Sequence, residues 1–116
     1  MSIAAYTRTI KETESPRQIE GRVVAQVTTA LERHAAEGPG SPEFRDALFR
    51  NQRLWGAFRG DLIDDDNALP AALRASLISL SFWVDRHTTA VLNGGDTAEA
   101  LIDVNRRILA GLRGNG

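Results

Sequence analysis

Proline placement is the feature that most constrains the fold of this chain. Pro16, Pro42 and Pro70 each precede a segment with helical apolar spacing. A proline is tolerated in the first turn of a helix, where the N–H that it lacks would have no intrahelical acceptor. Glycines close the segments at Gly38-Pro39-Gly40 and Gly94-Gly95. These signals predict helices over residues 16–37, 42–63, 70–93 and 96–112.

The predicted helix starts also carry side chains that can cap them. Ser15 and Gln18 have capping-box spacing, and Ser41 precedes Pro42. Asp96 and Glu99 repeat that spacing with Asp in place of Ser or Thr, and the connection that ends at Asn67 can cap the helix entered through Pro70.

Residues 2–14 can form a short helix or arm with Ile3, Tyr6 and Ile10 on one side, and residues 113–116 form a flexible tail. No alternating apolar run bounded by turn residues is present, which argues against a sheet. The expected fold is therefore all-α: one domain over residues 1–116, a small bundle of about four helices with an N-terminal arm or short helix.

Composition excludes several classes of function. The 116 residues contain no cysteine, which removes disulfides, Cys-ligated metals and a thiol nucleophile. Fourteen basic and fifteen acidic residues give a net charge of -1, and no basic cluster is longer than Arg106-Arg107, so direct nucleic-acid binding is disfavoured. The chain begins without a secretory signal pattern and has no membrane-length apolar stretch, so we expect a cytoplasmic protein with no membrane partner.

The segment from Pro70 to Asn93 is apolar over more than half of its helical circumference. One seam, spaced by alternating steps of four and three, is expected in the core, a second face is also apolar, and Trp83 lies beside the first seam. Either this is the central helix of the bundle, or one face binds a partner. The first seam contains Leu73, Leu77, Leu80, Val84, His87 and Val91, and the second face contains Ala71, Ala75, Ile78 and Phe82.

Catalytic patterns are absent from the sequence. His34 and His87 lie on different predicted helices, and the acidic run before Asn67 lacks the glycine and glutamate of a calcium loop. No nucleophile elbow or phosphate-binding motif occurs. Asn51 and Asn105 are predicted to be buried polar residues that fix packing register. We therefore expect no enzyme activity, no cofactor and no metal.

Several segments together resemble the FlaF family of flagellar biosynthesis regulators, and the resemblance covers nearly the whole chain. The most specific segment runs from Leu80 to Thr88, where two aromatic residues and an Arg-His pair occur together. The matching segments are Ala5-Tyr6, Glu14-Ser15-Pro16-Arg17, Asn51-Gln52-Arg53-Leu54-Trp55, Asn67-Ala68-Leu69-Pro70, Leu73-Arg74-Ala75, Ser79-Leu80-Ser81-Phe82-Trp83-Val84-Asp85-Arg86-His87-Thr88 and Leu101-Ile102-Asp103-Val104-Asn105-Arg106.

The resemblance implies a cytoplasmic protein that is needed for flagellin production and export, with flagellin as a partner, acting alongside FlbT, a regulator of flagellin translation. The Ala-Tyr arm and Ser-Pro helix start are also similar, over a short stretch, to the flagellin chaperone FliS. This similarity suggests a shared mode of holding the terminal amphipathic helices of flagellin, which would otherwise aggregate or polymerise.

The leading functional hypothesis is a flagellin-binding export chaperone or regulator. The expected groove or core residues are Trp55, Phe58, Ile78, Phe82 and Trp83, with Tyr6 and Ile10 as arm residues that can occupy the groove when it is empty. The alternative is a post-transcriptional regulator of flagellin mRNA, acting directly or through FlbT. Direct contact with RNA would require convergence on one face of Arg50, Arg53, Arg59, Arg74, Arg106 and Arg107.

Overall fold

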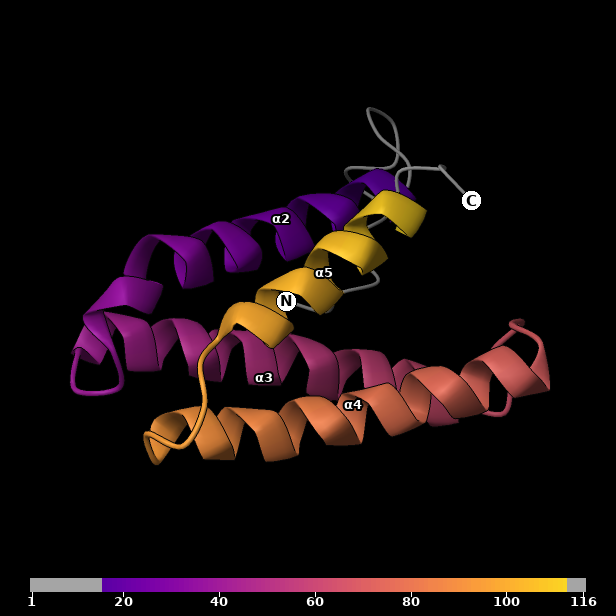
Figure 1. Ribbon diagram of the computed structural model, residues 1–116. Helices are drawn as coiled ribbons and strands as arrows, with labels where there is room; N and C mark the ends of the chain where they lie inside the picture. Colours follow the sequence, from indigo (N-terminus) through magenta and orange to yellow (C-terminus); the bar gives the residue numbers. More distant parts are fainter. Residues whose placement is uncertain (1–15, 113–116) are drawn as a thin grey trace.

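The computed structural model describes residues 16–112 as a helical bundle without strands in that range (Figure 1). The all-α prediction is confirmed, whereas the arm over residues 2–14, the cap at Ser15 and the tail lie outside the described residues. The elements are α2 (Pro16–His34), the 3-10 helix η1 (Ala35–Glu37), α3 (Pro42–Ile63), α4 (Ala71–Leu92) and α5 (Glu99–Leu112).

The start of α3 follows the sequence pattern closely. Pro42 stands in the first turn, and the Ser41 hydroxyl accepts a hydrogen bond from the backbone N–H of Phe44 at 3.2 Å. The same hydroxyl donates to the Glu37 carboxylate at 2.6 Å, and the His34 ring lies 2.7 Å from the other carboxylate oxygen. Ser41 first and His34 second lower the pKa of Glu37, because both contacts favour the ionised carboxylate.

Three helix ends differ from the predicted boundaries. α2 stops at His34 and the chain tightens into η1, whereas a single helix was predicted to Glu37. α4 begins at Ala71, because Pro70 has an extended ψ of 143° and is therefore the N-cap and not the first helical residue. The proline ring has no hydrogen-bond acceptor, so this helix has no side-chain cap. The last helix begins at Glu99, and Asp96 and Thr97 accept hydrogen bonds from the N–H groups of Thr97 and Glu99 respectively.

Asn67 shapes the α3–α4 connection and does not cap α4 as predicted. Its side-chain amide donates to the carbonyl of Asp61 at 2.9 Å, and its side-chain oxygen accepts from the N–H of Leu69 at 3.0 Å. These bonds close a turn within the connection, so the side chain is not available to the first turn of α4. By contrast, the predicted stop of α4 is confirmed, with Gly94 at a φ of 78° donating to the carbonyl of Val91.

α3 is the central helix of the bundle. It packs against α2 on one side and α4 on the other, and α5 packs mainly against α2 (Figure 1). The apolar face predicted for α3 is largely confirmed, since Phe44, Leu48, Trp55 and Leu62 are buried and Phe58 is partly buried. The core is completed by Leu31, Ala47, Val84, Val91, Ala98, Leu101 and Ile102.

A buried polar network ties α5 to α2 and α3, as the positions of Asn51 and Asn105 predicted. The Trp55 indole N–H donates to the side-chain oxygen of Asn105 at 2.9 Å. The Asn105 amide nitrogen donates to the Thr28 hydroxyl at 3.1 Å and to the side-chain oxygen of Asn51 at 2.8 Å. Because buried polar groups are costly when unpaired, these bonds specify how α5 sits on its neighbours.

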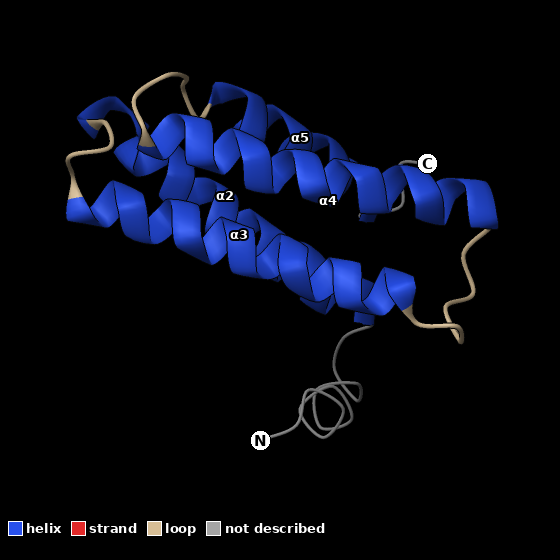
Figure 2. Ribbon diagram, turned by 90° about the horizontal axis from the view of Figure 1, so that it is seen from below, coloured by secondary structure: helices blue, strands red, loops and turns tan. Residues whose placement is uncertain are grey.

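α4 is covered along part of its length only. α5 starts beside the C-terminal end of α4 and then runs away from it toward the N-terminal end of α2 (Figures 1 and 2). The predicted core seam of α4 therefore changes along the helix: Val84 and Val91 are buried, whereas Leu73 is 45% exposed. The prediction that the whole seam lies in the core was wrong, because α5 does not follow α4 to its N-terminal end.

Candidate functional site

An open apolar groove lies where α5 departs from α4. Trp55, Phe58 and Leu62 of α3 line it from within the bundle, and α4 and α5 contribute the remaining helical walls. Its volume is about 680 Å³. The other lining residues are Glu20, Asp61, Asn67, Leu69, Leu73, Leu77, Arg107, Ile108, Gly111 and Leu112.

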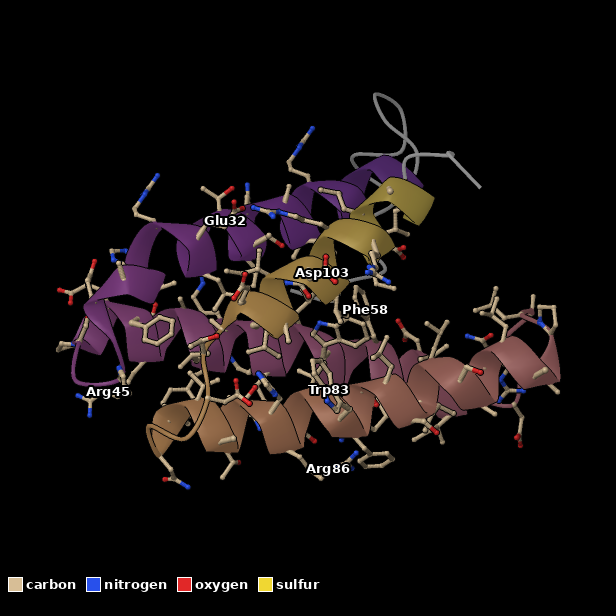
Figure 3. The ribbon with its side chains drawn as sticks, in the orientation of Figure 1. Glu32, Arg45, Phe58, Trp83, Arg86 and Asp103 are labelled. Atoms are coloured by element: carbon tan, nitrogen blue, oxygen red, sulfur yellow. The ribbon has the colours of Figure 1, made fainter. Side chains whose placement is uncertain are left out.

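The walls of the groove expose apolar surface that the described chain does not cover. Leu73 is 45% exposed and Leu69, in the connection before α4, is 41% exposed, whereas Trp55 is buried. Phe58, labelled in Figure 3, packs edge-to-face on Trp55 with ring centroids 5.6 Å apart, so the inner wall of the groove is an aromatic pair. Exposed leucines beside buried aromatics are typical of a surface that binds an apolar partner.

Arg74 holds the N-terminal half of α4 in position although α5 does not reach it. Its Nε donates to the carbonyl of Leu62 at 2.9 Å, and a terminal guanidinium nitrogen donates to the carbonyl of Asp64 at 3.1 Å. These carbonyls belong to the C-terminal end of α3, where they have no partner within the helix. The side chain therefore connects the N-terminal half of α4 to the end of α3.

The rim of the groove carries charges of both signs. Glu20 of α2 and Asp61 of α3 place carboxylates there, and Arg107 of α5 contributes a guanidinium. The Arg107 Nε lies 3.1 Å from the Asp103 carboxylate, one helical turn away on the exposed surface of α5. An apolar groove with a charged rim suits an amphipathic ligand whose polar edges reach solvent.

The predicted partner-binding residues separate into three groups. Trp55 and Phe58 line the groove. Ile78, Phe82 and Trp83 are not among its lining residues: Trp83 stacks on the His87 ring at 4.9 Å, and Phe82 lies on the opposite side of α4 from Leu73. Tyr6 and Ile10 lie outside the described residues.

Sequence reasoning missed most of the groove wall. Leu73 and Leu77 were assigned to the core seam, and Leu69, Ile108 and Leu112 were not singled out as partner residues. The sequence did contain a signal for Leu73. This residue lies one turn after the predicted helix start at Pro70, and the end of a helix is the part that a neighbouring helix most often leaves uncovered. Periodicity identifies an apolar face, but it does not show which neighbour covers that face.

The opposite face of α4 is occupied by contacts within the bundle. The Arg59 guanidinium lies 4.1 Å from the centroid of the Phe82 ring and donates to the Ser81 hydroxyl at 2.8 Å and to the Asp85 carboxylate at 2.6 Å. Gln52 donates to the other Asp85 oxygen at 3.2 Å. Phe82 is 45% exposed, but one face of its ring already contacts the Arg59 guanidinium.

Four of the six arginines considered for RNA binding have acceptors within the described part of the chain. Arg59 and Arg74 are held by acceptors of α3 and α4, and Arg106 and Arg107 pair with Glu32 and Asp103. Arg50 and Arg53 are exposed on α3. These pairings reduce the positive charge that the four side chains offer to a phosphate backbone.

Residues 16–112 contain neither a metal-binding cluster nor a membrane-spanning helix. In that range no three acidic or histidine side chains are arranged to hold a metal ion. None of the helices described there is long and apolar enough to cross a membrane.

Comparison with known proteins identifies the family. The family model described as "Flagellar protein FlaF" matches residues 2–112, which is nearly the whole chain. The match includes the groove-lining segments of α3, α4 and α5. No curated protein and no solved structure gave a match to the chain. The chain therefore belongs to the FlaF family of flagellar proteins.

Proposed function

We propose that the groove between α3, α4 and α5 binds flagellin. In this proposal the protein is a cytoplasmic secretion chaperone that covers the amphipathic terminal helices of flagellin and supports its synthesis and export. The observation that carries the proposal is the open apolar surface around Leu73 and Phe58. Membership of a flagellar family supports a partner from the flagellar system.

A helical ligand fits this groove for a geometric reason. The N-terminal half of α4 packs against α3, whereas α5 runs away from it, and that position holds the open groove of about 680 Å³. An amphipathic helix placed in that position would bury its apolar face against Leu73, Leu77 and Ile108 and leave its polar face in water. Burial of apolar surface contributes about 25 cal/mol per Å² before the ordering costs of binding are subtracted.

The proposal is tested with two matched variants of α4, Leu73→Asp and Phe82→Asp. Both residues are 45% exposed, and nine residues along a helix place them on opposite faces. Leu73→Asp puts a charge against the apolar groove and should weaken binding of flagellin or its terminal segments by about tenfold or more, since about 1.4 kcal/mol corresponds to tenfold. Phe82→Asp should change the affinity by about threefold at most.

Isothermal titration with purified flagellin measures both affinities, and circular dichroism checks that both variants remain helical. Equal weakening by the two variants would place the binding surface elsewhere or attribute the loss to misfolding. Absence of any complex with the unchanged chain would reject flagellin as the ligand.

The alternative function, direct control of flagellin mRNA, gains no support from the arginine positions described above. Regulation through FlbT would instead require that the protein binds FlbT directly. Mixing the two purified proteins and measuring the mass of the product decides whether FlbT binds, and Leu73→Asp in the same assay decides whether FlbT uses the groove.

A further inference from the structure

We propose that residues 2–14 of this chain occupy the groove when flagellin is absent, as an intramolecular competitor for the same surface. The segment would lie along α4 and α5 with Ile3, Tyr6 and Ile10 directed into the apolar lining. The inference rests on the proposed function in one respect, namely that the groove accepts an amphipathic helix. Flagellin and the segment then exclude each other.

The position of the segment in the chain favours this occupant. α2 begins at Pro16, and Glu20, one helical turn later, lines the groove. The chain that precedes Pro16 therefore starts close to one end of the groove. From residue 16 back to residue 3 a helix would extend about 20 Å and an extended chain about twice as far, so the segment is long enough to lie along the groove.

The side-chain pattern of the segment matches what the groove binds. Ile3, Tyr6 and Ile10 are spaced by three and four residues, the anchor spacing of helices that bind in grooves. Tyr6 can bury its ring while its hydroxyl reaches the polar rim. Leu69 and Leu73 offer exposed apolar surface to such anchors.

Charge bears on the arrangement through local pairs only, because the segment and the rim each carry charges of both signs. The segment contains Arg8 and Lys11 but also Glu12 and Glu14, and the rim of the groove carries the carboxylate of Asp61 beside the guanidinium of Arg107. Opposite charges at the edge of an apolar contact favour one orientation of the bound segment and reduce alternative ones. A cation of the segment can thus lie beside a rim carboxylate while its apolar face is buried.

Covalent attachment makes the competitor effective without high intrinsic affinity. A short connection gives the segment a millimolar effective concentration at the groove. If the segment fills the groove in nine molecules of ten, the apparent affinity for flagellin falls about tenfold. Flagellin with several apolar anchors can still displace it, so the groove is protected from unspecific apolar contacts before the partner arrives.

Paramagnetic NMR on the full chain tests the placement, and the absence of cysteine makes single-site labelling clean. A spin label on Ser2→Cys should broaden the amide signals of Leu73, Leu77 and Ile108. Signals of Arg45 and Arg86, which are exposed and outside the groove lining, should stay sharp (Figure 3). Adding Tyr6→Asp and Ile10→Asp to the labelled chain should abolish the broadening, whereas Ala5→Asp with Thr9→Asp should retain it.

Flagellin titration gives the second readout. The Tyr6→Asp, Ile10→Asp double variant should bind flagellin about tenfold more tightly than the unchanged chain, because the competitor is removed. Weaker binding by this variant would mean that the segment contacts flagellin directly, which would overturn the competitor role.

Mixing spin-labelled chains with isotope-labelled chains that carry no spin label separates the remaining outcomes. Broadening in the mixture would show that the segment binds a second copy, and uniform or absent broadening in the single chain would show that it does not bind the groove. Both results reject the proposal. The NMR experiment contains no flagellin, so it tests the placement of the segment independently. If flagellin does not bind but the broadening is observed, the proposed function is rejected and the placement of the segment is supported.

Discussion

The two halves of α4 have the same apolar periodicity but different surroundings. In the C-terminal half, Val84 and Val91 are buried and Thr88 is fully enclosed, whereas in the N-terminal half Leu73 is 45% exposed. The difference arises from α5, which meets one half and leaves the other. An apolar seam therefore supports the fold where a neighbouring helix covers it and becomes a binding surface where that helix departs.

The largest expected effect on the free energy of unfolding comes from Asn105, whose hydrogen bonds fix the position of α5 against α2 and α3. Asn105→Ala removes hydrogen bonds to Trp55, Thr28 and Asn51, and the unpaired groups that remain cost about 1–3 kcal/mol each. We expect the free energy of unfolding to fall by about 3 kcal/mol or more in urea denaturation. Asn93→Ala, at an exposed position after α4, should change it by about 0.5 kcal/mol at most. Equal effects of the two variants would show that the network does not fix α5.

Truncation in the two halves of α4 tests the comparison directly. Val84→Ala removes two buried methyl groups and leaves a cavity, which should lower the free energy of unfolding by about 2 kcal/mol. In the Tyr6→Asp, Ile10→Asp background, where residues 2–14 should leave the groove, Leu73→Ala removes more carbon atoms, but half of the side chain is in water, so we expect about 1 kcal/mol or less. A cost for Leu73→Ala in that background that matches Val84→Ala would mean that the bundle itself closes the groove in solution.

A smaller effect is expected where the two halves of α4 meet. Arg59→Ala removes bonds to Ser81 and Asp85 and the contact with Phe82, on a side chain that is 20% exposed. The free energy of unfolding should fall by about 1 kcal/mol, because solvent screens part of the ion pair. High salt should reduce the difference between Arg59→Ala and the unchanged chain. Salt-independence would attribute the loss to packing of the side chain.

The smallest effect is expected from the exposed ring on the outer face of α4. Phe82→Ala should change the free energy of unfolding by about 0.5 kcal/mol, the approximate value of an exposed cation–π contact. Flagellin affinity, measured in the same titration as for the Leu73 variants, should be unchanged. A clear loss of affinity would extend the binding surface to the second apolar face of α4, which contains Ile78 and Phe82.

The sequence predicted the helices because their ends depend on local chemistry. Pro42 with Ser41, and Gly94 after α4, act within one helical turn, and the structure places those ends within a residue of the expected positions. Asn51 and Asn105 were recognised because a polar residue on an apolar helix face is conspicuous in one sequence. These features need no knowledge of distant contacts.

The groove could not be predicted in the same way, because it depends on the direction of α5. That direction is set by bonds between residues far apart in the chain, such as Asn105 with Thr28. Trp55 and Phe58 could be predicted because they lie on the apolar face of one helix and carry large aromatic side chains. Leu73 and Leu77 were assigned to the core, since periodicity alone treats all positions of a seam alike.

Arg74 has a consequence for the kinetics of partner capture. Because its two bonds to the end of α3 already fix the free half of α4, the receiving surface loses little conformational entropy when a ligand enters. Most of the conformational entropy lost on association is then lost by the ligand. Differences between ligands should accordingly appear mainly in their dissociation rates, so that a segment with more apolar anchors has a longer residence time on the same preformed surface.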